Sequence, residues 1–143
     1  MDTTTLLEER AIQRQLVAFA RAMDNRDWTS IASICTPDIC ADFGTGEVTG
    51  RDTVISFMRS FLDHCGTTQH MLGNFVIDIH GDTANSECYV ADMHLSSSGN
   101  DDVSFRTLGN YSDNWVKAGG DWKLARRVKD NRAVIGSMDV FKP

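Results

Sequence analysis

The sequence lacks any long hydrophobic run, and no stretch approaches the roughly 20 consecutive apolar residues that a membrane-spanning helix needs. The N-terminal segment also lacks a charged region followed by an apolar one, which is the pattern of a secretory signal peptide. Basic residues are outnumbered, with 14 Lys and Arg against 20 Asp and Glu, and they form no long basic stretch. We therefore expect a cytoplasmic protein that binds neither membranes nor nucleic acid.

Motifs for metals and cofactors are missing as well. The four cysteines contain no C-x-x-C pair, so neither a zinc ribbon nor a thioredoxin-type redox motif is supported, and we expect reduced thiols. The histidines show no H-E-x-x-H pattern, and the glycine-containing turns match neither the P-loop nor the dinucleotide fingerprint. We expect no metal and no cofactor, and the ligand is predicted to be a small molecule.

What is present is the composition of an ordinary globular protein. The chain has 143 residues, of which 41% are hydrophobic and 24% are charged. A chain of this length buries a sizeable core without disulfides or metals. No internal repeat, low-complexity tract or linker interrupts it, so we predict one domain over residues 1–143.

The first part of the chain has helical patterning. Apolar residues at three- and four-residue spacing predict a helix over residues 5–24. Asp27 is predicted to cap a second, short helix, and Pro37 ends it because the residue before a proline disfavours the helical region. A short strand over residues 39–43, turns over 44–50 and a third helix near 51–64 are expected to follow.

The second part has extended patterning. Four stretches with turn signals between them are predicted as strands, near residues 67–80, 84–96, 103–117 and 121–133. Helices followed by an antiparallel meander indicate an α+β protein. We expect three helices packed on one face of a strongly curved, mixed and mainly antiparallel sheet, which forms a cone with a deep pocket.

Asp24 falls on the predicted core-facing side of the first helix, four residues after Ala20 and eight after Leu16. A buried carboxylate without a partner is costly or becomes protonated, so Asp24 needs a partner, and His70 is the best candidate. An imidazole with one nitrogen donating to a carboxylate has its tautomer and basicity fixed, as a general base requires. The alternative is that His70 is a hydrogen-bonded interior histidine or is exposed at a strand start.

Alternation along the strands assigns further candidates to faces. In the strand over residues 67–80, Asn74 shares a face with His70. In the last strand, alternation places Arg126 with Trp122 and separates it from Arg127, so only one of the two arginines can point inward. An inward guanidinium would neutralise Asp24 or stabilise an oxyanion. The alternative for each arginine is a solvated position with its stem on the surface.

Aromatic and polar residues of the middle strands are candidates for lining the same cavity. They are Tyr89, Asp92, His94, Phe105, Tyr111 and Trp115. Trp28 is predicted to face inward from the second helix and joins them. For each of these residues the alternative is a packing role, because aromatic side chains dominate protein cores.

Three segments resemble the SnoaL-like family of the nuclear transport factor 2-like superfamily: FARAMDNRDW at residues 19–28, TQHMLGN at 68–74 and DWKLARR at 121–127. The resemblance covers nearly the whole chain and implies an α+β cone with a deep pocket. The superfamily also contains isomerases, polyketide cyclases and non-catalytic binding proteins, so the fold alone assigns no chemistry.

The motif pattern is most similar to the branch of scytalone dehydratase and hexachlorocyclohexane dehydrochlorinase, which uses an aspartate and a histidine as a dyad. Asp24 and His70 match those positions, and Arg127, five residues after Trp122, matches an arginine of the dehydrochlorinase. The resemblance implies that His70 removes a proton from carbon and that Asp24 orients it. It also implies that Arg127, rather than Arg126, assists the departing group or holds the dyad.

Scytalone dehydratase also places tyrosines and a second histidine in its pocket, for which Tyr89, Tyr111 and His94 are the candidates here. The function predicted from the sequence is a cofactor-independent lyase that acts by β-elimination on a small, largely apolar cyclic molecule. An isomerase or polyketide-cyclase-type enzyme with the same base is one alternative, and a non-catalytic protein that binds a small hydrophobic ligand is another. A homodimer or homotrimer is expected, because the outer face of a curved sheet must be covered or polar.

Overall fold

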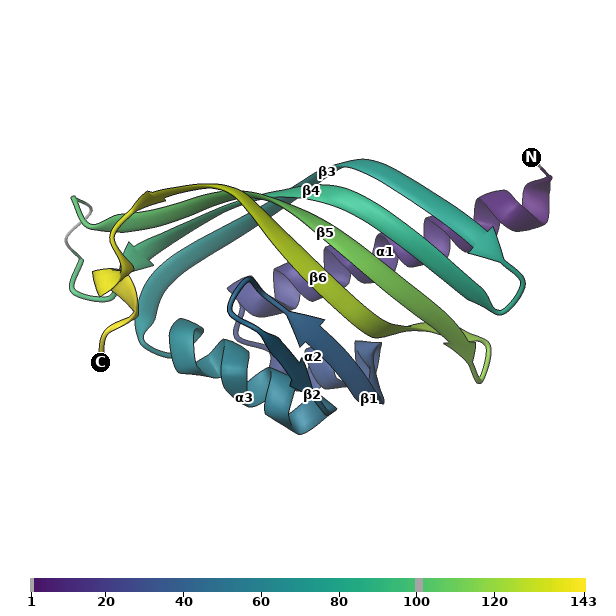
Figure 1. The fold of residues 1–143 in the computed structure, drawn as a ribbon, viewed down its shortest axis with the longest axis horizontal. Helices are drawn as coiled ribbons and strands as arrows, with labels where there is room; N and C mark the ends of the chain where they lie inside the picture. Colours follow the sequence, from purple (N-terminus) through teal and green to yellow (C-terminus); the bar gives the residue numbers. More distant parts are fainter. Residues whose placement is uncertain (1, 100–101) are drawn as a thin grey trace.

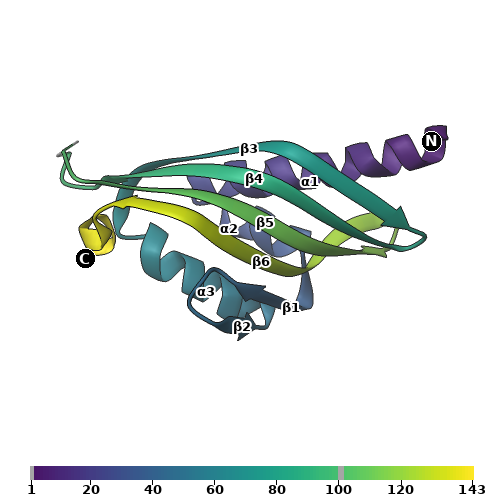
Figure 2. The ribbon, with the colours of Figure 1, turned by 45° about the horizontal axis from the view of Figure 1, so that its top comes forward.

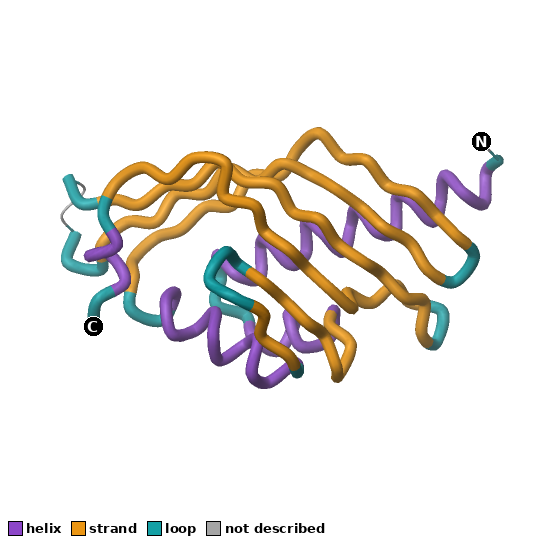
Figure 3. Tube along the Cα trace, in the orientation of Figure 1, coloured by secondary structure: helices purple, strands orange, loops and turns teal. Residues whose placement is uncertain are grey.

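The computed structural model describes residues 2–99 and 102–143. Within these residues the chain forms three α-helices, six strands and a short 3-10 helix, with the helices mainly first and the long strands after them (Figure 3). In chain order the elements are α1 Thr3–Asp24, α2 Trp28–Ile34, β1 Cys35–Asp42, β2 Glu47–Thr49, α3 Arg51–Leu62, β3 Cys65–His80, β4 Thr83–Ser96, β5 Ser104–Ala118, β6 Asp121–Gly136 and η1 Met138–Phe141.

The strands form one sheet in the order β2-β1-β6-β5-β4-β3. Neighbouring strands are antiparallel except for β1 and β6, which are parallel. The long strands β3 to β6 bend along their length and arch over the helices (Figures 1 and 2). The predicted α+β fold with a curved, mixed sheet is confirmed, and a turned view shows that α1 runs along β3.

The core lies between the helices and the inner face of the sheet. α1 contributes Ile12, Leu16 and Phe19, none of which is more than 1% exposed, and the sheet contributes Trp115 and Leu124. Burying side chains of this size is the main source of stability for such a fold. None of the described helices has both the length and the apolar character needed to cross a membrane.

The start of α2 follows its sequence signal, whereas α1 begins at Thr3, before the predicted residue 5, and the first strands differ from the prediction. Asp27 caps α2 as predicted, and its carboxylate accepts a hydrogen bond from the backbone N–H of Ser30. β1 begins at Cys35 and not at residue 39, so Pro37 lies within the strand. The ladder with β6 shifts its register between Cys35 and Cys40, which tolerates a proline that has no N–H to donate. The segment 47–49, predicted as part of a turn, pairs with β1 as β2.

A bulge in β3 changes the direction of its side chains. The register with β4 shifts between Gly73 and Val76, and Asn74 takes a φ of 54°, which few residues other than glycine adopt. His70 and Leu72 face inward before the bulge, whereas Asn74 is exposed. The prediction that Asn74 shares the face of His70 was wrong, because the extra residue interrupts the alternation on which that prediction rests.

A second irregularity decides between the two arginines of β6. Trp115 pairs with Leu124 and Asn114 pairs with Arg126, so Ala125 is an extra residue in the ladder. Arg127 is therefore buried and only 1% exposed, while Arg126 is exposed. Strict alternation, which placed Arg126 with Trp122, was wrong, and the resemblance pointed to the arginine that faces inward.

The end of the chain is a short 3-10 helix that follows the last strand. β6 continues to Gly136, beyond its predicted end at 133, and η1 follows, which the sequence analysis did not predict. Gly136 has a φ of 101°, and a Cβ there would meet the backbone oxygen of Ser104 at 2.1 Å, so the turn into η1 requires glycine. Asn100, which belongs to the predicted turn after β4, lies outside the described residues.

Candidate active site

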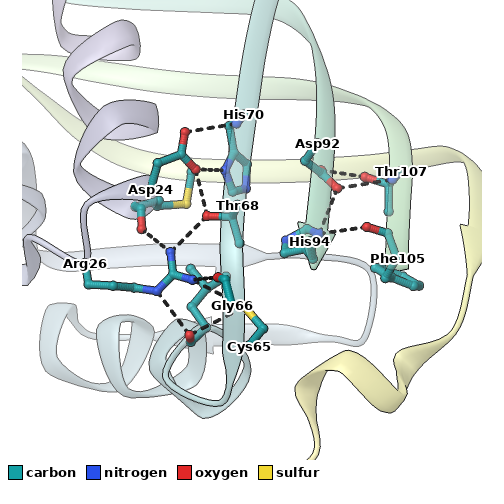
Figure 4. A network of polar contacts seen from close by, with 12 residues as sticks. Asp24, Arg26, Cys65, Gly66, Thr68, His70, Asp92, His94, Phe105 and Thr107 are labelled. Atoms are coloured by element: carbon teal, nitrogen blue, oxygen red, sulfur yellow. Dashed lines mark hydrogen bonds and ion pairs between the residues drawn. The ribbon is translucent and has the colours of Figure 1, made fainter. Parts of the chain in front are cut away.

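Asp24 and His70 form the pair that the sequence predicted. Asp24 is the last residue of α1, and His70 lies on the adjacent strand β3. The carboxylate oxygen Oδ1 of Asp24 is 2.7 Å from Nδ1 of His70, and Oδ2 accepts the backbone N–H of His70 at 3.0 Å (Figure 4). The His70 side chain is 5% exposed and that of Asp24 is 20% exposed, so the pair is largely shielded from water.

The electrostatics of the pair favour a carboxylate next to an Nδ1–H imidazole. Burial by itself raises the pKa of Asp24, but the hydrogen bonds and charge of His70, together with a hydrogen bond from Thr68, outweigh burial and hold the pKa below its ordinary value. The ionised carboxylate accepts the Nδ1 proton of His70. Nε2 is then the free acceptor of the ring, which is the form required of a general base.

Arg26 supports this pair through Thr68, a role that no pattern in the sequence predicted. Its guanidinium donates to Thr68 Oγ1 at 2.9 Å, and Thr68 in turn donates to Oδ1 of Asp24 at 2.9 Å. The same guanidinium donates to the backbone oxygens of Met23, Leu62 and Gly66, so it ties together the ends of α1 and α3 and the start of β3 (Figure 4). The φ of Arg26, 55°, directs the chain out of α1.

His70 also lines a cavity of about 250 Å³ between α3, the bent ends of the long strands and η1. The walls are mostly apolar: Met23, Phe43, Phe57, Met58, Phe61, Leu62, Phe105, Tyr111, Val134, Met138 and Phe141. The polar side chains on the walls are Thr45, His70, His94, Thr107, Lys129 and Asn131. A cavity of about 150 Å³ holds a benzene molecule, so this one has room for a substituted ring.

Aromatic rings in edge contact form a belt along the cavity wall. Phe61 meets Phe141 at 5.5 Å between centroids, and Phe141 meets Phe105 at 5.4 Å and His94 at 5.0 Å. His94 then meets His70 at 5.5 Å. Aromatic rings prefer edge contacts of this kind, so the belt packs η1 and β5 against the two histidines.

His94, a predicted pocket residue, is the second histidine of the cavity. Its Nδ1 is 3.2 Å from the backbone oxygen of Phe105, which can only accept, so Nδ1 carries the proton. Burial lowers the pKa of His94 to about 4, more than the nearby carboxylate of Asp92 raises it. His94 is therefore neutral at physiological pH.

Lys129 brings the only ammonium group found among the described cavity-lining residues. Its Nζ is 2.8 Å from Oδ2 of Asp92 and 2.8 Å from Oγ1 of Thr107. Asp92 also accepts from the backbone N–H and the hydroxyl of Thr107. Sequence reasoning missed Lys129 and Asn131, although both follow Arg127 at two-residue intervals and so share its face once Arg127 is placed inward.

A second hollow, of about 550 Å³, lies on the other side of the dyad, between α1 and β3. Asp24, Arg21, Asn25 and Gln69 border it together with His70. The dyad thus separates an apolar cavity from a polar, solvent-facing groove.

A sequence model of the SnoaL-like domain matches residues 4–128. The chain belongs to the SnoaL-like family. An uncharacterised protein of Mycobacterium tuberculosis is 31% identical to this SnoaL-like protein over 120 residues, which cover 82% of this chain and 81% of the relative. The same identity and coverage are found with an uncharacterised protein of Mycobacterium bovis.

Solved structures share the fold of this SnoaL-like protein at lower identity. A presumed scytalone dehydratase from Novosphingobium aromaticivorans has a TM-score of 0.87 at 24% identity, covering 96% of this chain and 92% of that one. A hexachlorocyclohexane dehydrochlorinase of type 3 from Novosphingobium barchaimii has a TM-score of 0.82 at 18% identity, covering 96% and 94%. The likeness shows the nuclear transport factor 2-like fold.

The other predicted pocket residues of the SnoaL-like protein divide into two groups. Tyr111 lines the cavity, as does His94. Tyr89 is 46% exposed under the guanidinium of Arg132, and Trp28 lies beneath Arg59, so neither is among the residues that line the cavity. The prediction that Tyr89 lines the cavity was wrong, because Tyr89 points to the face of β4 opposite to that of the buried Cys88 and Val90.

Arg127 lies behind the cavity wall and not on it. Its Nε and Nη2 donate to the two carboxylate oxygens of Asp113, at 2.9 and 3.0 Å. The guanidinium stacks between rings, 3.8 Å from the centroid of Tyr111 and 4.5 Å from that of Phe19. Burial disfavours the charge of Arg127, but Asp113 outweighs burial and raises the pKa of the guanidinium, so Arg127 is a permanent cation beneath Tyr111.

No group of three or more His, Cys, Asp or Glu side chains in the described residues is arranged to hold a metal ion. The four cysteines are unpaired, and Cys35 and Cys88 are buried. Burial raises the pKa of Cys35 to about 11 and that of Cys88 to about 12, so neither is a nucleophile at neutral pH. The groups suited to chemistry are therefore the histidines, the lysine and the carboxylates around the cavity.

Proposed function

We propose that this protein is a cofactor-independent lyase that eliminates water, or another leaving group, from a small and largely apolar cyclic substrate. The observation that carries the proposal is the dyad at the wall of the apolar cavity. Asp24 accepts from Nδ1 of His70 at 2.7 Å, and His70 itself lines the cavity. An imidazole base held in one orientation and one tautomer suits removal of a proton from carbon.

In the proposed reaction Nε2 of His70 takes a proton from a substrate carbon, and the electrons of that C–H bond form a new C=C bond. The bond from the neighbouring carbon to the leaving oxygen breaks, and the oxygen takes the bonding pair. The imidazolium of His70, stabilised by the carboxylate of Asp24, then gives its proton to the departing hydroxide, so that water leaves. The dyad returns to its starting state without a cofactor.

Arg127 acts in this proposal as a positioning residue. Nε and Nη2 of Arg127 both donate to the carboxylate of Asp113. Among the described residues, Arg127 has no hydrogen bond to Asp24 or His70. It stacks on Tyr111, which lines the cavity, so it fixes the wall against which the substrate lies.

The size and character of the cavity support a cyclic substrate. About 250 Å³ of mostly aromatic and aliphatic wall accommodates a ring with a few substituents. Exclusion of water from such a site strengthens the interaction between the imidazolium and Asp24. Proteins of the same fold are named as a hexachlorocyclohexane dehydrochlorinase and a presumed scytalone dehydratase, which is consistent with elimination chemistry here.

The test is to incubate the protein with a panel of small hydroxylated cyclic ketones in heavy water and to follow both mass and deuterium content. Elimination of water lowers the product mass by the mass of water, and His70→Ala abolishes it, while the matched control His80→Ala, an exposed histidine outside the cavity, retains it. If the wild type and His70→Ala eliminate water at equal rates, His70 is not the base.

The same experiment distinguishes the two alternatives. An isomerase or polyketide-cyclase-type enzyme that uses His70 exchanges hydrogen at carbon for deuterium without expelling a group. A protein that only binds a small hydrophobic ligand holds the ligand without changing its mass or exchanging its hydrogens for deuterium. The apolar cavity wall is the observation that favours this alternative.

A homodimer or homotrimer stays a prediction. Met71, Leu108 and Ile135 are exposed apolar residues of the sheet, which another copy of the chain would cover. Light scattering of the purified protein tests the oligomeric state.

A further inference from the structure

Lys129 and Asn131 lie two residues apart on β6, and both line the cavity that His70 lines. We propose that they form a polar subsite for an oxygenated ring: the Lys129 ammonium donates to a carbonyl or anionic oxygen of the ligand, and Oδ1 of Asn131 accepts from a ligand hydroxyl. The proposal deepens the proposed function by naming the chemical class of the ligand. It rests on the proposed function only in taking this cavity as the ligand site.

The backbone of β5 is shaped to let Lys129 reach its position. Gly109 lies beneath the stem of Lys129, and a Cβ at Gly109 would meet Cε of Lys129 at 3.0 Å. The glycine therefore leaves room for the stem to cross β5 towards Asp92 and Thr107, which flank Gly109 on β4 and β5. The ammonium group is held in one place, since Asp92 Oδ2 and Thr107 Oγ1 each lie 2.8 Å from Nζ.

One N–H of Lys129 remains for a ligand. An ammonium group has three donors, and Asp92 and Thr107 take two of them. No further hydrogen-bond partner of Nζ occurs among residues 2–99 and 102–143, and the side chain of Lys129 is 12% exposed. Because Lys129 lines the cavity, the third donor is suited to an oxygen of a bound molecule.

Asn131 presents the complementary group. Its Nδ2 donates to the backbone oxygen of Phe43 at 3.0 Å, and this contact fixes which end of the amide is the oxygen. Oδ1 is buried and has no hydrogen-bond partner in the described part of the chain. A buried acceptor without a partner is costly, and a hydroxyl of the ligand would satisfy it.

The subsite therefore selects for rings that carry both a carbonyl or anionic oxygen and a hydroxyl. A hydrocarbon of the same size fills the apolar walls but leaves Asn131 Oδ1 unsatisfied. Sites built to hydrogen-bond a ligand reject analogues that lack the matching group more strongly than they reject analogues that differ in one methylene. This preference is measured by dissociation constants alone and requires no catalytic turnover.

The test uses three kinds of probe of similar shape: hydroxyacetophenone in each of its positional isomers, acetophenone and ethylbenzene. Dissociation constants are measured by ligand-observed NMR or calorimetry. Wild-type protein is expected to bind its preferred hydroxyacetophenone at least about 10-fold more tightly than ethylbenzene, because a hydrogen bond to a charged donor is among the strong ones. The 15N signal of the Lys129 ammonium is expected to shift with the ketones and not with ethylbenzene.

Two variants separate the two groups. Lys129→Met should weaken both ketone probes by about 10-fold or more and leave ethylbenzene within about twofold. Asn131→Leu should weaken only hydroxyacetophenone, by about fivefold. If Lys129→Met fails to fold because Asp92 loses its partner, Gly109→Ala displaces the lysine stem instead and is expected to weaken the ketones in the same selective way.

Equal affinity of the wild type for hydroxyacetophenone and ethylbenzene would overturn the proposal, as would an equal loss of all three probes in Lys129→Met. His70→Ala is expected to keep the preference for oxygenated probes, because His70 is not part of the subsite. Wild-type protein that shows this preference but catalyses no elimination would therefore contradict the proposed lyase function and leave the subsite standing.

Discussion

Asp24 holds His70 at two points, with Oδ1 at 2.7 Å from the ring nitrogen Nδ1 and Oδ2 at 3.0 Å from the backbone nitrogen. One carboxylate thus fixes both the direction of the imidazole and the strand that carries it. Asp24 retains some contact with water on the side of the groove between α1 and β3. The geometry makes the tautomer of His70 depend on a single side chain.

Replacing Asp24 by Asn keeps the shape of the side chain but removes the charge that stabilises a protonated His70. We expect turnover of a confirmed substrate to fall by about 100-fold or more, because the amide no longer enforces the Nδ1–H tautomer. The 15N shifts of the His70 ring report the tautomer directly. Asp27→Asn changes an exposed carboxylate at the start of α2 and serves as the control; equal activity of the two variants would contradict the orienting role.

Replacing His70 by Gln removes the base. The expected loss of turnover is at least about 100-fold, the range in which general acid–base catalysis contributes. His80→Gln alters a histidine at the exposed end of β3, where its ring contacts Asn85, and should leave turnover unchanged. A His70→Gln variant whose kcat/KM has the same pH profile as the wild type would show that another group is the base.

Arg127 and Arg126 differ sharply in their expected contribution to stability. Arg127→Met leaves the carboxylate of Asp113 buried without a partner and should lower the free energy of unfolding by about 3–5 kcal/mol. Arg126→Met removes an exposed pair with Glu47 and should change stability little. Urea unfolding measures both.

The double variant Arg127→Met with Asp113→Leu tests the reason for that loss. It replaces both charges by apolar groups of similar size, so much of the lost stability should return. A double variant no more stable than Arg127→Met alone would show that the cation–π contacts with Tyr111 and Phe19, and not the charge left on Asp113, account for the effect.

His94 makes stability depend on pH in a defined direction. Its folded-state pKa of about 4 lies below the ordinary value of 6.5, so between these values the unfolded chain binds the proton more readily. The contribution is fully present above pH 6.5 and is lost as the pH falls towards 4. Between pH 6.5 and 5 the expected loss from this group is about 2 kcal/mol. His94→Phe should reduce the difference in unfolding free energy between pH 7 and pH 5 by that amount; an unchanged difference would contradict the assignment.

Periodicity was sufficient to predict the helices and the long strands, because these features depend on spacing within one element. It placed Asp24 on the core-facing side of its helix, and the family resemblance matched His70, on another element, to the same pair. Periodicity failed where the ladder gains a residue. The bulges at Asn74 and Ala125 reverse the faces of the residues around them, and a bulge is a property of the pairing with a neighbouring strand, which a single strand's pattern does not contain.

The rest of the candidate site depends on tertiary contacts that no local pattern encodes. Arg26 matters because four backbone or side-chain oxygens from three elements converge on it. Lys129 reaches Asp92 and Thr107 across Gly109, where a Cβ would lie 3.0 Å from Cε of the lysine. Phe141 joins the aromatic belt from an element of four residues, too short to be recognised by periodicity.

The position of η1 divides the site into parts that lie far apart in the sequence. Asp24 and His70 belong to the first half of the chain, whereas Phe141, which closes the belt against His94 and Phe105, lies among the last residues. Residues that precede η1 therefore carry the whole dyad, and η1 adds the wall of the cavity that Met138 and Phe141 form over the ends of β4 and β5. A change confined to the last residues of the chain would alter ligand binding and leave the contact between Asp24 and His70 in place.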